Sequence, residues 1–312
     1  MRYFGLLGLA VLLSCSSGGG GGDGGGGGGR GWLVARGGLI ARIDGNLTVQ
    51  QGSSPTNRDL HNLVCVGHQL GWAGGDGGTI IATKDGGSHW TLQSTPTLSA
   101  LRGLSFADAN DGVAAGDSGV LLRTSDGGST WAAVVSPVSS SLRAIAFSSD
   151  RLHAWAAGDS GVLLRSSDGG ASWSVVASGT TAALRGIKFA DDGMHGVAVG
   201  DAILRSSDGG LTWTAAAQPP QSLSGVSLSG SRAVAVGAAG LIWRSTDAGA
   251  TWSRVVASAG ANLKSIGFVD ETPDIGWAVG EGGTVLYTDD GGAQFTAVAS
   301  GITSDIESVE DL

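Results

Sequence analysis

Residues 124–131 read TSDGGSTW, and variants of this octapeptide recur along the chain. The six clear copies are TKDGGSHW (83–90), TSDGGSTW (124–131), SSDGGASW (166–173), SSDGGLTW (206–213), STDAGATW (245–252) and TDDGGAQF (288–295). Their aspartates, Asp85, Asp126, Asp168, Asp208, Asp247 and Asp290, are 41, 42, 40, 39 and 43 residues apart. A decayed seventh copy, GLIARIDGN (38–46), precedes them. A period near 40 residues is typical of one four-stranded propeller blade, so we expect an all-β, seven-bladed β-propeller.

Each repeat divides into four short strands, which we call A to D. In residues 101–135, LRGLSF is strand A, VAAG strand B, VLLRTS strand C and WAAVV strand D, with the turns DANDG, DSG and DGGST between them. Gly- and Asp-rich turns between short apolar runs are typical of antiparallel hairpins. Within the octapeptide, the aspartate is expected to accept backbone N–H bonds while the glycines take positive φ. The octapeptide therefore has a structural function.

The two ends of the chain are expected to share one blade. The N-terminal unit begins at Trp32 in strand B and lacks strand A, whereas the C-terminal residues DIESVEDL (305–312) match the start of a strand A. We expect the C-terminal strand to complete the first blade, because a closed ring leaves no long unpaired edge.

The N-terminus is interpreted as a targeting segment. Residues 1–15, MRYFGLLGLAVLLSC, form a lipoprotein signal peptide: Arg2 precedes an apolar run too short to span a bilayer, and the run ends in the lipobox-like LLSC, with Cys15 as the lipidated residue. Residues 16–31, SSGGGGGDGGGGGGRG, cannot bury apolar area and are expected to be a flexible tether. The propeller then spans residues 32–312. An ordinary signal peptide without lipidation is the alternative.

Composition excludes one class of partner. The formal net charge is −9, so we expect no nucleic-acid binding, which needs clustered Lys and Arg. No histidine pair has metal-ligand spacing on one strand, so we expect neither a metal nor a cofactor.

Charges alternate in compensating pairs at two positions of the repeat. One position is the second residue of strand A, and the other is the residue that opens the B–C turn of the same repeat. The residues at these two positions are, in that order, Arg102 with Asp117, Arg143 with Asp159, Arg185 with Asp201, Lys264 with Glu281 and His61 with Asp76. In one repeat both are neutral (Ser224 and Ala238), and in the closing blade the signs are reversed (Glu307 and Arg36). This compensation predicts contact in space. The ring of pairs is either a structural set of salt bridges or a polar docking surface for a partner.

Catalysis is not expected. Four D–A connections (136–141, 178–183, 217–222 and 258–262) carry no carboxylate, histidine or basic residue. The first D–A connection (52–59) is the exception and carries Arg58 beside a single acid, Asp59. Glycoside hydrolysis needs a carboxyl pair or, in sialidases, a tyrosine nucleophile. The one tyrosine beyond the signal peptide, Tyr287, falls in the column of Arg123, Arg165, Arg205 and Arg244, which we interpret as a surface position of strand C.

The octapeptide resembles the BNR or Asp-box repeat, and the whole unit, LRxIxF followed by GWAVG and the box, resembles the photosystem II stability/assembly factor-like propellers. The resemblance covers residues 32–312 and implies seven blades and a role in assembling a membrane protein complex. The lipobox and the Gly-rich tether are departures from that family.

These features together predict a non-catalytic interaction or assembly module. We expect a monomeric lipoprotein of the cell envelope, on the periplasmic side of a membrane or at the outer membrane or cell surface, with a protein partner. The alternative is a carbohydrate-active Asp-box protein, either a lectin-like binder or a sialidase- or xyloglucanase-like hydrolase.

Overall fold

A computed structural model describes residues 31–43, 49–67, 69–148, 150–257, 260–268, 273–298, 303 and 305–308. Cys15, the expected signal peptide and nearly all of the expected tether lie outside these residues, as does Asp44 of the decayed repeat. The first strand, β1, begins at Gly31, which had been assigned to the tether. Within the described residues no helix is long and apolar enough to cross a bilayer.

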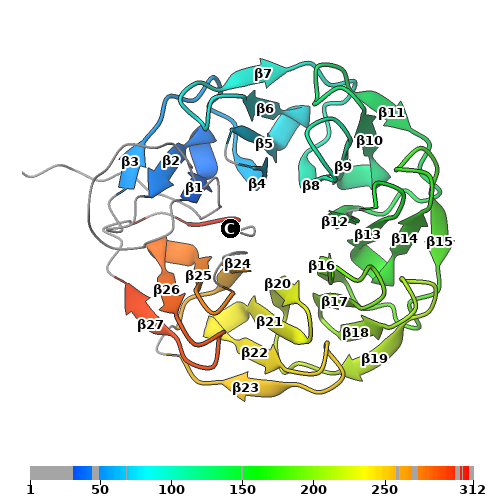
Figure 1. The fold of residues 1–312 in the computed structure, drawn as a ribbon, viewed down its shortest axis with the longest axis vertical. Coiled ribbons are helices and arrows are strands. Elements are labelled where there is room, and N and C mark those ends of the chain that lie inside the picture. Colours follow the sequence, from blue (N-terminus) through cyan, green and yellow to red (C-terminus); the bar gives the residue numbers. More distant parts are fainter. Residues whose placement is uncertain are drawn as a thin grey trace, which may run out of the picture.

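The described residues form six four-stranded antiparallel blades and one three-stranded sheet, arranged radially around a centre (Figure 1). Blade I consists of β4 Leu60–Val66, β5 Leu70–Gly75, β6 Ile80–Thr83 and β7 Thr91–Gln93, and blade II of β8 Leu101–Phe106, β9 Gly112–Gly116, β10 Leu121–Thr124 and β11 Ala132–Val134. Blade III consists of β12 Leu142–Phe147, β13 Ala154–Gly158, β14 Leu163–Ser166 and β15 Ser174–Val176, and blade IV of β16 Leu184–Phe189, β17 Gly196–Gly200, β18 Ile203–Ser206 and β19 Thr214–Ala217. Blade V consists of β20 Leu223–Ser229, β21 Arg232–Gly237, β22 Ile242–Ser245 and β23 Ser253–Val255, and blade VI of β24 Leu263–Phe268, β25 Gly276–Gly280, β26 Val285–Thr288 and β27 Thr296–Val298. The N-terminal sheet is β1 Gly31–Val34, β2 Ile40–Ile43 and β3 Val49–Gln51. In each blade, strand A lies nearest the centre and strand D at the rim (Figure 1).

The expectation of four strands in every one of seven blades therefore holds for six blades and not for the N-terminal sheet. There the C-terminal segment contributes a single bridge, between Ala35 and Ile306, in place of a fourth strand. In the other blades, strand A pairs once with the end of strand B, skips one residue at a bulge, and only then pairs continuously, as in Leu101 with Gly116 and Gly103 with Ala115. The bridge between Ala35 and Ile306 corresponds to the first of these pairs.

The Asp box forms the turn between strands C and D, as the sequence predicted. In blade II, one carboxylate oxygen of Asp126 accepts bonds from the Thr124 hydroxyl and the Thr130 backbone N–H, both at 2.8 Å. The Thr124 hydroxyl in turn accepts the N–H of Gly128 at 2.8 Å. Gly127 and Gly128 have φ values of 69° and 80°, which glycine adopts without the steric cost of a Cβ.

Aromatic side chains join neighbouring blades. Trp155 of β13 stacks on Phe189 of blade IV, with ring centroids 3.6 Å apart, and its indole N–H donates to the carbonyl of Gly209 at 3.1 Å. Phe189 in turn meets the box tryptophan Trp213 edge to face at 5.7 Å. A Cβ on Gly196 would lie 2.5 Å from the Phe189 ring, so only glycine fits beneath it. Because Trp155 and Trp213 are buried and Phe189 is partly buried between them, these contacts hold the two blades together.

Arginines that precede the boxes cross the same boundaries. Arg165 donates its Nε to the carbonyl of Gly209 at 3.0 Å, and Arg123, Arg205 and Arg244 make the equivalent bonds to Gly169, Ala248 and Gly291. The interpretation of this column as a surface position was therefore incomplete. These partly buried side chains link each of blades II to V to the box of the next blade.

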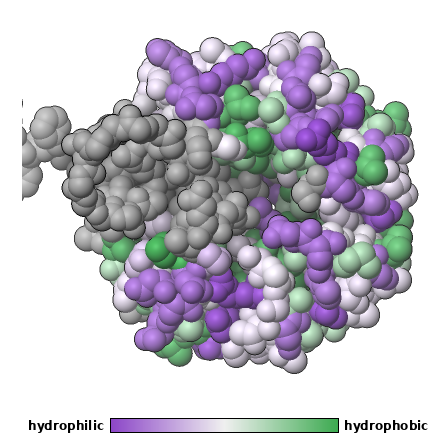
Figure 2. All heavy atoms as spheres, viewed as in Figure 1, coloured by the Kyte–Doolittle hydropathy of each residue, from purple (hydrophilic) through white to green (hydrophobic). Residues whose placement is uncertain are grey.

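The propeller has two chemically different faces. On one, which we call the box face, the boxes bond to the A–B turns, as in Gly169 N–H to the carbonyl of Leu152 at 2.8 Å. The other, the ring face, carries the start of each strand A, the D–A connections and the B–C turns, for example Asp117 N–H to the carbonyl of Ala100 at 2.9 Å. On the side shown in Figure 2, hydrophilic residues are spread around the described part of the surface.

Candidate functional site

The ring residues are positioned by a bulge. In blade II, Leu101 pairs with Gly116 and Gly103 with Ala115, so that Arg102 is the extra residue between them. A bulged residue leaves the ladder and its side chain is re-aimed. The same register shift occurs in the other five blades, where the extra residues are His61, Arg143, Arg185, Ser224 and Lys264. This regular bulge brings every member of the column to the ring face beside the B–C turn.

The predicted pairs are present. The closest nitrogen–oxygen distances are 2.9 Å for Arg102 with Asp117, 2.6 Å for Arg143 with Asp159, 2.7 Å for Arg185 with Asp201 and 3.0 Å for Lys264 with Glu281. Three of these pairs are two-point arginine–carboxylate contacts, because each guanidinium reaches both oxygens of its partner. Such fork-to-fork geometry fixes orientation as well as adding energy.

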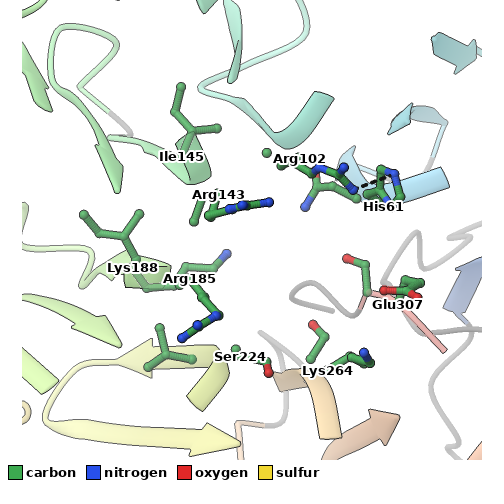
Figure 3. Close-up of a pocket in the computed structure, with 18 residues that line it drawn as sticks. His61, Arg102, Arg143, Ile145, Arg185, Lys188, Ser224, Lys264 and Glu307 are labelled. Carbon is green, nitrogen blue, oxygen red and sulfur yellow. Dashed lines mark hydrogen bonds between the residues drawn. The ribbon is translucent and has the colours of Figure 1, made fainter. Parts of the chain in front are cut away.

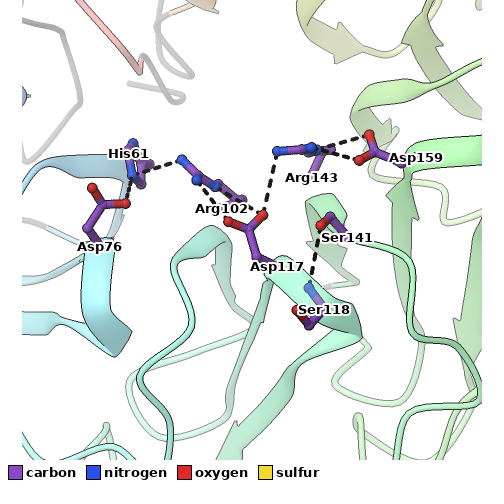
Figure 4. A network of polar contacts seen from close by, with 8 residues as sticks. All are labelled: His61, Asp76, Arg102, Asp117, Ser118, Ser141, Arg143 and Asp159. Atoms are coloured by element: carbon purple, nitrogen blue, oxygen red, sulfur yellow. Dashed lines mark hydrogen bonds and ion pairs between the residues drawn. The ribbon is translucent and has the colours of Figure 1, made fainter.

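Contacts also run from blade to blade (Figure 4). His61 Nε2 lies 2.6 Å from Asp76 and 2.9 Å from Nη1 of Arg102, while Arg143 Nη1 lies 3.5 Å from the carboxylate of Asp117. The pairs of blades I, II and III therefore form one continuous network. The sequence left open whether a base would meet the acid of its own blade or that of a neighbouring blade, and the structure contains both kinds of contact.

The closing pair is also present. Arg36, which opens the turn after β1, lies 3.0 Å from Glu307 and 3.6 Å from Asp305. In blade V, where Ser224 and Ala238 are neutral, there is no charge to pair at these positions. In the neighbouring blade IV, the carboxylate of Asp201 accepts a hydrogen bond from the hydroxyl of Ser222 as well as from Arg185.

The charges stabilise one another. The hydrogen bond from Arg102 is the largest cause of the lowered pKa of Asp117, and the bond to Asp159 is the largest cause of the raised pKa of Arg143. The side chains of Arg143 and Asp159 are 35% and 36% exposed, so water screens the pair. Each pair therefore contributes about 0–1 kcal/mol to stability. The ring accordingly consists of oriented, partly exposed charges that add little to the stability of the fold.

Beneath the ring lies a cavity of about 150 Å³, lined by residues of the innermost strands and by Glu307 and Ser308 (Figure 3). Its wall carries guanidinium and ammonium groups together with backbone at small residues such as Gly186 and Gly225. The bulged side chains of the ring are part of its lining. It is the point at which six blades converge.

The acids near this face have structural partners. Asp59, the one acid of the D–A connections noted above, accepts the backbone N–H of Gly37 at 2.7 Å, and Asp305 accepts that of Gly282 at 3.1 Å. Tyr287 contacts Trp277, and burial together with the nearby Asp289 raises its pKa, which disfavours the phenolate form. Among the described residues, no group of three or more His, Cys, Asp or Glu side chains could hold a metal ion.

Fold and site together define an Asp-box β-propeller with a charged ring at the mouth of its central cavity. The family described as Photosynthesis system II assembly factor YCF48 matches residues 88–181 and 173–263, more than half of the chain. The chain belongs to this family, which confirms the resemblance seen in its repeats. No curated protein matches the sequence.

Solved structures share the fold. YCF48 bound to D1 peptide is 21% identical, with a TM-score of 0.63, over 78% of this chain and 81% of that one. YCF48 from Cyanidioschyzon merolae is 18% identical, with a TM-score of 0.64, over 82% of this chain and 89% of that one. The GH74 enzyme of Niastella koreensis is 11% identical, with a TM-score of 0.62, over 98% of this chain and 68% of that one. At these identities the likeness concerns the fold alone.

Proposed function

We propose that this protein is a non-catalytic interaction module, tethered to a membrane through Cys15, that binds a protein partner in an envelope complex through its ring face. The observation that carries the proposal is the set of bulged, oriented charges, linked from blade to blade in blades I to III, on one face of a propeller of the assembly-factor family. A solved relative is described as bound to a peptide, which supports a protein partner for this chain as well.

We propose further that the N-terminal sheet is a seventh blade, completed by the C-terminal segment. Ile306 N–H donates to the carbonyl of Gly280 at 3.0 Å, and Leu60 N–H donates to that of Ala35 at 3.3 Å. Leu60 is the first residue of strand A in blade I, and its N–H bonds to the sheet that precedes that blade. Ile306 makes the equivalent bond to blade VI, which precedes the C-terminal segment. Its bridge to Ala35 has the register of Leu101 with Gly116. A closed ring would place Arg36 and Glu307 on the same surface as the charged pairs of the other blades.

The proposal is tested by capture from solubilised membranes. The variant Arg102→Ala/Arg143→Ala removes two linked members of the ring. Arg151→Ala serves as the matched control, because Arg151 lies on the box face, where it pairs with Asp108 at 2.8 Å. We expect a defined partner to be recovered with the wild type and the control but reduced at least tenfold with the ring variant. Equal recovery with all three proteins contradicts docking at the ring.

A carbohydrate-active protein is the second candidate, favoured by the fold shared with the GH74 enzyme over 98% of the chain. Against it, the acids of the ring are paired with bases and Asp59 is bonded to backbone. Assays with β-glucan and sialoside substrates distinguish the two. We expect no turnover; hydrolysis that is abolished by replacing one carboxylate establishes the second function instead.

A further inference from the structure

His61 is the histidine of the charged ring, and its contacts differ from those of the other histidines that the structure describes. Its Nε2 lies 2.6 Å from Oδ1 of Asp76 and 2.9 Å from Nη1 of Arg102 (Figure 4). Asp76 belongs to the same blade and Arg102 to the next, so one atom contacts both blade I and blade II. The other described histidines each bond through Nδ1 to an aspartate three or four residues away on the box face; they are His89, His153 and His195.

The two contacts of His61 make opposite demands on Nε2. A carboxylate oxygen only accepts hydrogen bonds, whereas a guanidinium nitrogen only donates them. Nε2 either carries a proton and donates to Asp76, or carries a lone pair and accepts from Arg102. The imidazolium form carries a proton on both ring nitrogens, so protonation of His61 removes the acceptor that Arg102 needs. The two hydrogen bonds therefore exclude one another.

Burial indicates which of the two bonds forms when His61 is neutral. The side chain of Asp76 is 46% exposed, whereas those of His61 and Arg102 are 14% and 29% exposed. Water therefore reaches the carboxylate of Asp76 more readily than the guanidinium of Arg102. A polar group left without a partner costs more where water reaches it less, so we expect the neutral imidazole to accept from Arg102.

The other charged groups near His61 leave this competition to Asp76 and Arg102. β4 packs against β8, β1 and the turn that follows β1, and His61 lines the same cavity as the C-terminal segment. The closing pair is bonded within itself, and the guanidinium of Arg58 lies against Gly77 in the B–C turn of blade I. The titratable and charged groups on these elements are Arg36, Arg58, Asp59, Asp76, Arg102, Asp305 and Glu307.

We propose that His61 is a proton-operated switch between blades I and II. In the neutral state, Nε2 accepts from Nη1 of Arg102 and joins the two blades. In the imidazolium state, Nε2 donates to Asp76 and releases Nη1, while Nε and Nη2 of Arg102 stay on Asp117. The released N–H groups and the added positive charge change the surface that the ring face offers to an acceptor on another molecule.

The switch concerns the ring face whether or not a partner docks there. Its failure would leave the docking proposed above untouched, and a failure of docking would leave the switch untouched. Where a partner does dock at the ring face, the switch makes the donors available to that partner depend on pH.

Nitrogen NMR of the full chain in detergent, with isotopically labelled histidine and arginine, tests the switch. The chemical shift of a ring nitrogen distinguishes an acceptor Nε2 from a protonated one, and His61→Gln identifies the His61 signals. Histidine ordinarily changes its charge between about pH 5 and pH 8, so the two states are compared at these values. We expect an unprotonated Nε2, coupled through a hydrogen bond to Nη1 of Arg102, at the higher pH. At the lower pH we expect a protonated Nε2 without that coupling.

Arg102→Ala separates the switch from an ordinary histidine titration. Without the competing donor, Nε2 should carry a proton and donate to Asp76 even at the higher pH. Arg151→Ala, which removes an arginine of the box face, is the matched control and should behave as the wild type does. The melting temperature of each variant checks folding. The proposal is overturned if Nε2 of the wild type has the same state at both pH values, or if Arg102→Ala leaves its state at the higher pH unchanged.

Discussion

Arg36 and Glu307 are 271 positions apart in the sequence and are joined by an ion pair of 3.0 Å. Their contact brings the two ends of the folded chain together on the ring face, with the signs of the usual pair reversed. The pair itself is weak, because the side chain of Arg36 is 56% exposed. The adjacent Ile306 is fully buried, in one hydrophobic cluster with residues of the N-terminal sheet and of blade VI.

Replacing Ile306 tests the closure. We predict that Ile306→Ala lowers the free energy of unfolding by about 2–5 kcal/mol, the usual cost of emptying a buried aliphatic site. Deleting residues 303–312 should destabilise the protein further or cause aggregation, since it exposes an edge of the N-terminal sheet. Denaturant unfolding measures both effects. Leu98→Ala, at a position that is 85% exposed, is the control, and a truncated chain as stable as the full one contradicts the closure.

Trp155 tests the packing between blades III and IV. We predict that Trp155→Ala costs about 3–5 kcal/mol, because it removes both the stack on Phe189 and the bond to Gly209. Trp155→Phe should cost less, since it keeps a ring against Phe189. Thermal or denaturant melts with Leu211→Ala as an exposed control give the comparison. A loss no larger than that of the control would show that the stack contributes little.

The boxes predict a pH dependence of stability. Hydrogen bonds from His89 lower the pKa of Asp85 to about 2, and those from Thr251 lower the pKa of Asp247 to about 2, from an ordinary value of 3.8. A lowered folded-state pKa means that the stabilisation is present above pH 3.8 and is lost as the pH falls towards 2. The melting temperature should therefore fall between about pH 4 and pH 2. The variant Asp85→Asn/Asp247→Asn should show a shallower fall, and an unchanged slope would rule out these two carboxylates as a source.

Cys15 tests the proposed anchor. We predict that Cys15→Ser releases the protein from the membrane fraction or stalls its processing, because a lipidated cysteine supplies the membrane affinity. Fractionation followed by immunoblotting measures the distribution, with Cys65→Ser as the control for general loss of a thiol. Membrane association that is unchanged in Cys15→Ser would show that the anchor is elsewhere.

Much of this site could be read from the repeat itself. The alternation of Arg102 with Asp117, and its reversal in Glu307 with Arg36, predicted contacts that the structure contains. Residue identity in aligned columns was sufficient because every blade repeats one backbone geometry. The same reasoning missed the bond from Arg165 to the carbonyl of Gly209, since an alignment of repeats carries no information about which group of the next blade a side chain meets. It also gave no sign of the bulge at Arg102, which depends on strand register.

Photocrosslinking in living cells tests docking at the ring face most directly. A photoreactive residue is placed either at the exposed Ser139, in a D–A connection of the ring face, or at Leu152, which is 53% exposed on the box face. The account predicts a discrete crosslinked protein partner from position 139 that is lost when Arg102→Ala/Arg143→Ala is added, and none from position 152. A partner crosslinked from position 152 alone, or from position 139 with equal yield in the ring variant, would contradict it.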